Sequence, residues 1–127
     1  MKIGVLTSSR ADFGIYHPLL EKMIDDDFFN ISLIVFGMHM SKKHGLTYKE
    51  IESYGYKIKH KLDINIEGDS PFHISKLVGD INNQFSLFWK NNKEKFDLIF
   101  CLGDRFEMFA AVISGIPFGI NFVHFHG

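Results

Sequence analysis

The chain has 127 residues, of which 46% are apolar and 23% are charged. This is the length of one domain and the composition of an ordinary folded protein, which excludes two complete catalytic domains, a disordered chain and a membrane protein. The net charge of -1 argues against nucleic acid or an anionic membrane as a partner held by bulk charge. With one cysteine and no signal-peptide pattern at the N-terminus, we expect a reducing, cytoplasmic location.

The N-terminal region reads as strand, loop and helix. Residues 2–7 are apolar and β-branched, which predicts a strand, and the loop SSRADFG follows. The next segment has apolar residues at helical spacing, namely Ile15, Leu19, Leu20, Met23 and Ile24. Residues 25–27 are three aspartates, which we expect in the connection because acidic side chains oppose the dipole at a helix C-terminus.

A second strand and helix follow. Residues 31–36 predict a buried strand, and residues 37–45 form a polar loop. Thr47 begins a helix in which Glu50, three residues later, completes a capping-box pattern, and Tyr54 and Gly55 end it.

The second half of the chain repeats this alternation. Residues 56–66 predict a third strand, and residues 98–102 predict a central strand that is buried on both faces. Between them lies the clearest amphipathic helix, with apolar residues at Ile74, Leu77, Val78, Ile81, Phe85 and Phe88.

A last helix and strand complete the pattern. The helix has its apolar positions at Phe106, Phe109, Ala110 and Ile113. Gly115 and Pro117 end it, and residues 118–123 predict a fifth strand. Alternating strands and helices predict an α/β fold with a doubly wound, Rossmann-like parallel sheet in the order 3-2-1-4-5. Ligands of such sheets bind at the carboxyl ends of the strands, where SSRAD, the 37–45 loop, GDR and HFHG are all expected.

The loop after the first strand is a candidate anion site. Backbone N–H groups at the start of the helix favour an anion, and Arg10 offers a bidentate contact to phosphate. The alternative is structural, with small residues that let the chain turn and with Asp12 as the helix cap.

Asp104 is a candidate acid/base because it directly follows an apolar strand, where partial desolvation raises the pKa of a carboxyl. Its neighbours in sequence are Arg105 and Glu107. The alternative is that Asp104 is the N-cap of a helix beginning at Arg105, with Glu107 as the capping-box partner. Both roles are compatible, since a cap also fixes the position of the carboxylate.

Four histidines lie in the loops. His124 and His126 are two residues apart on an extended segment, so we expect them on one side, where they suit an anionic substrate. They fall short of the three or four ligands of a metal site, so we expect no metal. His39 and His44 are read as solvated loop residues or substrate contacts. Cys101, within an apolar strand, is expected to be a buried, inert thiol.

The segments TSSRADFGIYHPLL, FGMHMSKKHGLTYKEIE and LGDRFEMFAA, together with the final HFHG, resemble the hydrolysing UDP-N-acetylglucosamine 2-epimerases of sialic-acid and related nonulosonic-acid biosynthesis. The resemblance covers the whole chain in the right order. It implies the N-terminal domain of a glycosyltransferase-B type enzyme, in which two Rossmann-like domains enclose the active site. The implied reaction removes the proton at C2, eliminates UDP to a glycal and adds water to give N-acetylmannosamine, without a cofactor.

The resemblance also implies roles for single residues. Arg10 matches the arginine near the nucleotide diphosphate, Asp104 matches the acid/base aspartate of the GDR motif, and His124 and His126 match the histidines of an HxHGGE loop. We add Asp12, His39 and Arg105 from the same loops as candidate substrate-binding residues.

The sequence departs from the family by ending at Gly127, before the second glycine and the glutamate of that loop and before a second domain. We therefore expect residues 1–127 alone to be an incomplete N-terminal domain without activity. We also expect a homo-oligomer, because the edge near residues 118–123 is left partly uncovered.

Two other functions remain open, namely a non-catalytic nucleotide-binding or regulatory module, and a donor or acceptor domain of a glycosyltransferase. The substrate also remains open between UDP-N-acetylglucosamine and related diacetamido sugar nucleotides.

Overall fold

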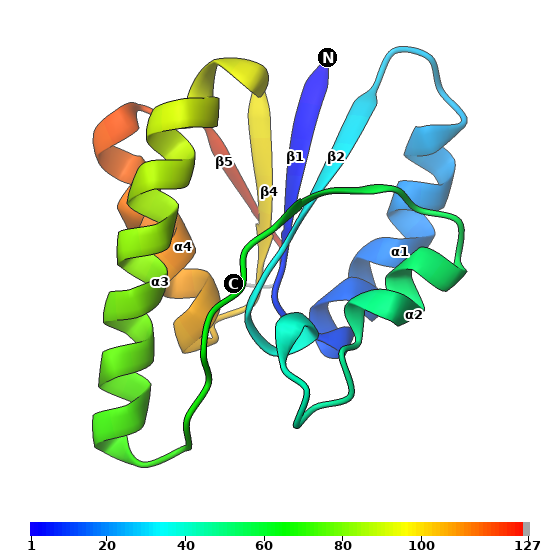
Figure 1. Cartoon of the computed structure of the whole chain (residues 1–127). Helices are drawn as coiled ribbons and strands as arrows, with labels where there is room; N and C mark the ends of the chain where they lie inside the picture. Colours follow the sequence, from blue (N-terminus) through cyan, green and yellow to red (C-terminus); the bar gives the residue numbers. More distant parts are fainter. Residues whose placement is uncertain (126–127) are drawn as a thin grey trace.

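The computed structural model describes residues 1–125, which form a five-stranded sheet between two layers of helices (Figure 1). All strand pairs are parallel, and the order β3-β2-β1-β4-β5 is the predicted one. The strands are β1 (Lys2–Thr7), β2 (Asn30–Val35), β3 (Ile58–Lys61), β4 (Leu98–Leu102) and β5 (Phe122–Phe125). The helices are α1 (Arg10–Ile24), α2 (Tyr48–Ser53), α3 (Pro71–Asn92) and α4 (Phe106–Gly115).

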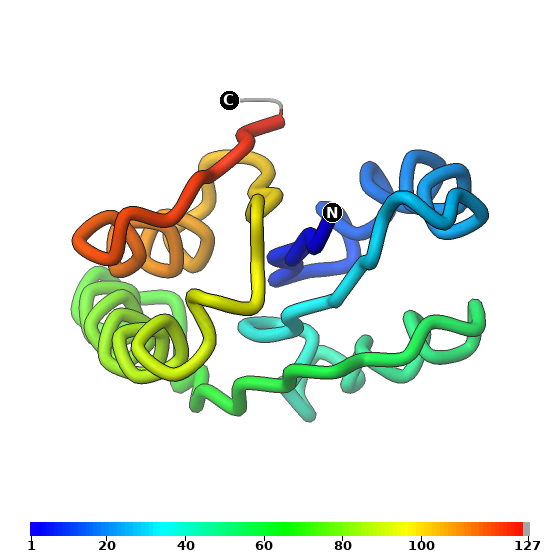
Figure 2. Tube along the Cα trace, turned by 90° about the horizontal axis from the view of Figure 1, so that it is seen from above, coloured from blue at the N-terminus to red at the C-terminus, as the bar shows by residue number. Residues whose placement is uncertain are grey.

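Alternating side chains of the strands supply both cores, as burial on two faces requires. On β1, Ile3 and Val5 pack with α1 and α2, whereas Leu6 points to the other face, where α3 and α4 lie. Figure 1 separates these two helix pairs on either side of the sheet, and Figure 2 shows α3 and α4 packed beside each other. The sheet is therefore doubly wound, as predicted.

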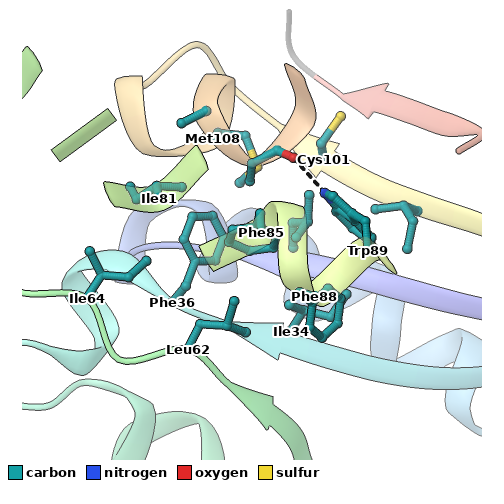
Figure 3. Packing of buried hydrophobic residues seen from close by; sticks show 14 of the residues in the cluster. Ile34, Phe36, Leu62, Ile64, Ile81, Phe85, Phe88, Trp89, Cys101 and Met108 are labelled. Atoms are coloured by element: carbon teal, nitrogen blue, oxygen red, sulfur yellow. Dashed lines mark hydrogen bonds between the residues drawn. The ribbon is translucent and has the colours of Figure 1, made fainter. Parts of the chain in front are cut away.

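The core on the α3 side is rich in aromatic residues. Phe36 from the end of β2 meets Phe85 edge to face, with ring centroids 4.8 Å apart, and Phe88 and Trp89 extend the cluster (Figure 3). The Trp89 indole N–H donates to the carbonyl of Ala111 at 3.1 Å, so this buried polar group is satisfied and ties α3 to α4. The stripe predicted for α3 is confirmed at its centre.

The predicted faces of α1 and α4 are largely wrong. On α1 the buried apolar residues are Phe13, Tyr16, Leu20 and Met23, while the predicted Ile15, Leu19 and Ile24 are exposed. On α4 the predicted Phe106, Phe109 and Ile113 are exposed, and small residues face inward, with Ala110, Ala111 and Gly115 among them.

Close packing explains the face that α4 presents. A Cβ atom on Gly115 would lie 2.7 Å from Cζ of Phe122 and 3.1 Å from Nε1 of Trp89. Only a small residue fits so near these rings, so Phe106, Phe109 and Ile113 lie outward, although Met108 of the same helix is buried in the core.

β3 and β5 differ from their predicted bounds by more than one residue. β3 is shorter than residues 56–66: the Leu62 N–H makes a last backbone bond to β2, to the carbonyl of Val35 at 2.8 Å, and the side chains of Leu62 and Ile64 pack against the core under α3. β5 begins later than residue 118: a 3₁₀ turn over Ile116–Phe118 is followed by Gly119 in the left-handed region at φ +70°, and only then does the chain pair with β4.

Candidate functional site

The predicted loops collect at the carboxyl edge of the sheet, which is the lower edge in Figure 1. The loops after β1, β2 and β4 begin there at Ser8, Phe36 and Gly103. Gly103 has φ +79°, a conformation that glycine adopts freely and that allows the turn into Asp104 and Arg105.

Arg10 and Asp12 belong to the first turn of α1 and not to the loop before it. Ser9 is the N-cap, accepting from the backbone N–H of Asp12 at 3.5 Å, so the reading of Asp12 as the cap is wrong. The Arg10 side chain is 68% exposed and forms an ion pair with Glu50 of α2, with 2.9 Å between Nε and Oε2. Arg10 therefore lies at a helix N-terminus with its guanidinium accessible.

Asp12 is buried beneath this first turn. Its Oδ2 accepts from the backbone N–H of Ser8 at 2.9 Å and from Ser8 Oγ at 2.8 Å, and its Oδ1 contacts Thr7 Oγ1. Burial raises the pKa of Asp12, while the hydrogen bonds from Thr7 and Ser8 oppose that rise. Asp12 fixes the β1–α1 turn from inside.

His39 is fully buried, so the reading of it as a solvated residue is wrong. Its Nε2 lies 2.8 Å from Thr7 Oγ1 and its Nδ1 lies 2.8 Å from Thr47 Oγ1. Burial lowers the pKa of His39 to about 4, so the ring is neutral at physiological pH. His44, by contrast, is exposed and bonded only to Ser41.

The second helix starts where predicted, with Thr47 at its N-cap position, but the capping box is wrong. Thr47 makes no side-chain bond to the helix backbone, because its hydroxyl contacts His39 instead. Glu50 is held by Arg10. Both side chains thus bond to residues at the carboxyl edge of the sheet and do not cap α2.

Asp104 is exposed, so the partial desolvation predicted for it is wrong within residues 1–125. It is not the N-cap of α4 either: that position is Arg105, and no side-chain capping bond is made. The buried Glu107 accepts from Arg105 Nε at 3.2 Å, and Arg105 Nη2 approaches Met38 Sδ at 3.0 Å. Arg105 is therefore oriented while the Asp104 carboxylate remains open to solvent.

His124 lies at the end of β5, beside the turn that precedes Asp104. Its Nε2–H donates to the carbonyl of Gly103 at 2.8 Å, which couples β5 to this turn. His126, predicted to lie on the same side, falls outside the described residues. Cys101, the register partner of His124 on β4, is buried as predicted, and burial raises the pKa of its thiol to about 11.

The candidate residues are divided among three hollows. The Arg10 hollow, of about 330 Å³, is lined by Arg10, His39, Thr47 and Glu50 among others. The Arg105 hollow, of about 410 Å³, lies between Met38, Lys43, Asp69, Arg105 and Glu107. The His124 groove, of about 430 Å³, takes in Asp104 and His124 beside Phe109, Ile113, Ile116 and Phe122. Residues 1–125 do not bring Arg10 and Asp104 into one hollow.

Some residues of this edge were missed from the sequence. The sequence predicts Thr7 only as the end of a strand, Thr47 only as the start of a helix and Lys43 only as part of a polar loop. The hydroxyl of Thr7, at the end of β1 and directly before SSRAD, is the one signal that marks the first of these.

The described residues also bear on metal and membrane binding. Within residues 1–125, no three histidine, cysteine, aspartate or glutamate side chains are grouped to hold a metal ion. In the same range, none of the helices combines the length and apolar character that crossing a membrane requires.

Two curated relatives align with 99% of this chain. A polysialic acid biosynthesis protein, P7, of Escherichia coli is 35% identical over 99% of this chain and 32% of its own length. A UDP-N,N'-diacetylbacillosamine 2-epimerase (hydrolyzing) of Legionella pneumophila is 30% identical over 99% of the chain and 33% of its own length. The chain thus spans about a third of the length of these curated relatives.

Solved structures show the same fold. A crystal structure of UDP-N-acetylglucosamine 2-epimerase superposes with a TM-score of 0.80 at 16% identity, covering 98% of this chain and 32% of that one. The Neisseria meningitidis enzyme bound to UDP-GlcNAc gives 0.74 at 15% identity, covering 98% and 31%. This confirms the Rossmann-like fold of an N-terminal domain of the glycosyltransferase-B type. The family model described as UDP-N-acetylglucosamine 2-epimerase matches residues 21–127, so the chain belongs to the UDP-N-acetylglucosamine 2-epimerase family.

Proposed function

We propose that this chain is the N-terminal domain of a hydrolysing 2-epimerase that acts on UDP-N-acetylglucosamine or a related diacetamido sugar nucleotide. Two relatives that are 30% identical over 99% of this chain are named hydrolyzing 2-epimerases of diacetylbacillosamine nucleotides, which supports both the substrate class and the hydrolytic outcome. Relatives whose names do not include the word hydrolyzing also match, such as the UDP-N-acetylglucosamine 2-epimerase of Neisseria meningitidis at 31% identity. We place the enzyme in the cytoplasm.

The observation that carries the proposal is the chemistry of the carboxyl edge. Arg10 offers an accessible guanidinium at the N-terminus of α1, a place that favours phosphate. Arg105 adds a second cation, oriented by Glu107, and follows Asp104, whose carboxylate is exposed, in the sequence. In the proposed reaction Asp104 exchanges a proton with the sugar, and the cations stabilise the diphosphate as UDP leaves. Water then adds to the glycal and gives the free 2-epimer.

The first test replaces Asp104 in the protein expressed from its full reading frame. Asp104→Asn keeps the shape but removes the exchangeable proton, so we expect UDP release from the sugar nucleotide to fall by about 100-fold or more. Asp27→Asn, an exposed aspartate beyond the far end of α1, is the matched control and should keep wild-type activity. Release is measured for UDP-N-acetylglucosamine and for a diacetamido sugar nucleotide. Full activity of Asp104→Asn would remove this residue from the acid/base role.

The products test the hydrolytic outcome separately. Free N-acetylmannosamine or its diacetamido counterpart, together with UDP, is expected from the full reading frame. A 2-epimer that is still attached to UDP would contradict hydrolysis and leave only the epimerase.

The 127-residue polypeptide is expected to release no UDP under the same conditions. The reaction needs more than one carboxylate and a second domain to hold the nucleotide, and residues 1–125 leave Arg10 and Asp104 in separate hollows. Turnover by this polypeptide would contradict the expectation, whereas UDP binding without turnover would favour a nucleotide-binding module.

A further inference from the structure

Four side chains form a buried hydrogen-bonded chain beneath the Arg10 hollow. Asp12 Oδ1 contacts Thr7 Oγ1, Thr7 Oγ1 lies 2.8 Å from His39 Nε2, and His39 Nδ1 lies 2.8 Å from Thr47 Oγ1. Asp12, Thr7 and His39 are buried, while Thr47 is half-buried and lines the hollow together with Arg10. The chain thus runs from the inside of the first turn of α1 to the surface of the hollow.

With Asp12 ionised, the hydrogen bonds among these four side chains run in one direction. A carboxylate only accepts, so the single hydroxyl hydrogen of Thr7 points to Asp12. Thr7 Oγ1 must then accept from His39, which puts the ring hydrogen on Nε2, because burial keeps His39 neutral. The bare Nδ1 finally accepts from the hydroxyl of Thr47.

With Asp12 protonated, the whole chain reverses. The carboxyl O–H donates to Thr7, the Thr7 O–H donates to His39 Nε2, and the ring hydrogen moves to Nδ1 and donates to Thr47 Oγ1. The Thr47 hydroxyl hydrogen is then released from His39 and can donate into the hollow. One proton enters at Thr47, each group passes one proton on, and one proton ends on Asp12. Both arrangements satisfy all four groups, so neither leaves an unpaired buried atom.

We propose that Asp12, Thr7, His39 and Thr47 form a reversible proton relay that turns Thr47 from an acceptor into a donor at the Arg10 hollow when Asp12 takes up a proton. His39 is then a positioning residue, acting through the Thr47 hydroxyl. The consequence for the enzyme rests on the proposed function, in which a phosphate group lies beside Arg10. A donor at Thr47 suits such an anion, so phosphate binding and proton uptake by Asp12 would favour each other.

The surroundings of the relay fit this use. Burial raises the pKa of Asp12, which brings its proton uptake nearer to neutral pH. The other charged or titratable groups that line the same hollow or lie against Asp12 are Arg10, Tyr16 and His17 on α1, Glu50 on α2 and Tyr54 directly after α2. Arg10 and Glu50 pair with each other.

The test reads the His39 tautomer by ¹⁵N NMR of the ring nitrogens in the 127-residue chain, without any substrate. At pH 8 the wild-type ring should carry its hydrogen on Nε2. In Asp12→Asn, the amide oxygen is needed to accept from Ser8, so the amide nitrogen faces Thr7 and imitates the protonated acid. We expect the His39 hydrogen to move to Nδ1. His44, exposed and outside the relay, is the internal control and should be unchanged.

Further measurements keep the inference falsifiable if that variant does not fold. Lowering the pH of the wild-type chain stepwise from 8 should exchange the His39 tautomer before the ring becomes doubly protonated. Thr7→Val removes the link, so the tautomer should be the same in Thr7→Val and in Thr7→Val combined with Asp12→Asn. Double protonation of the His39 ring without an earlier exchange of its tautomer, or one tautomer in wild type and Asp12→Asn alike, would overturn the relay. Because no turnover is measured, such a result is distinct from a failure of the proposed enzyme activity.

Discussion

The environment of His39 in the structure differs from the one that its sequence neighbours predict. In the sequence it stands in a polar loop beside two lysines, where a solvated histidine is the ordinary expectation. In the structure its exposed fraction is zero, and both ring nitrogens are hydrogen-bonded to threonines. The difference arises because the loop after β2 folds back over the end of β1, a contact between segments more than thirty residues apart.

The burial of His39 predicts an acid-sensitive stability. An unfolded histidine titrates near pH 6.5, whereas folded His39 has a pKa of about 4. The unfolded chain therefore binds more protons between these values, and the free energy of unfolding falls as the pH falls through that window. By pH 5 the loss is about 2 kcal/mol. The variant His39→Gln should lack this part of the fall in the free energy of unfolding between pH 7 and pH 5, as measured by urea unfolding.

The control for this measurement is His44→Gln, at an exposed position in the same loop, which should lose as much stability as the wild type. Asp12 acts in the opposite sense, because its raised pKa makes the folded chain take up a proton first, but it is present in all three proteins. An identical pH dependence in His39→Gln and wild type would contradict the assignment of a buried neutral ring.

At the scale of elements, the N-terminus of α3 follows the usual preferences for capping residues. Ser70 is its N-cap, with Oγ accepting from the backbone N–H of His73 at 3.2 Å, and Pro71 occupies the first turn, where its missing N–H costs nothing. This helix contributes Leu77, Ile81, Phe85, Phe88 and Trp89 to the core on its face of the sheet. Its start is therefore a sensitive point for the stability of the domain.

Ser70→Ala removes the cap and should lower the free energy of unfolding by about 1 kcal/mol. The matched control is Ser86→Ala on the same helix, where the hydroxyl bonds back to the carbonyl of Asn82 and alanine is a good helix former. That variant should stay within about 0.5 kcal/mol of wild type. Chemical denaturation of both variants measures the difference, and equal losses would show that the capping bond is not what matters at Ser70.

The elements themselves could be predicted from the sequence, but not every face or boundary. β1 and β4 have their predicted bounds, since a buried parallel strand reads as an unbroken apolar run. The faces of α1 and α4 could not be predicted, because both helices carry two overlapping apolar stripes and periodicity does not choose between them. On α4 the choice is made by Phe122 and Trp89, which leave room only for glycine at position 115.

The same limit applies to the candidate site. The placement of Arg10 and Asp104 at the carboxyl edge of the sheet follows from the order of the elements along the chain, whereas the start of α1 at Arg10 does not. The pairing of Arg10 with Glu50, and the link from Thr7 through His39 to Thr47, could not be predicted, because they depend on how loops from different strands meet.

Across the whole molecule, the outer side of α4 stands out. Phe106, Phe109 and Ile113 are 58%, 56% and 43% exposed, and Ile116 just beyond the helix is 61% exposed. They lie next to β5, the edge strand, and three of them line the His124 groove. Contiguous apolar surface of this kind favours association.

We therefore expect the 127-residue chain to associate through this surface. Phe109→Asp places a charge in its middle and should shift the population towards monomer in sedimentation equilibrium over a range of concentrations. Leu87→Asp, which replaces an equally exposed residue on α3, is the control and should leave association unchanged. A monomer at every concentration in the unsubstituted chain would contradict this expectation.

The central place of β1 has a consequence for the order in which the protein folds during synthesis. β1 leaves the ribosome before the other four strands, yet one of its two neighbours in the sheet is β4. Ile3 of β1 pairs with Leu98, ninety-five residues later in the chain. Until β4 emerges, one side of β1 has no partner, and the apolar side chains of α3 have no complete sheet to cover. A nascent chain that stops before β4 thus exposes a strand edge of the kind that chaperones shield, whereas one that includes β4 can close its core.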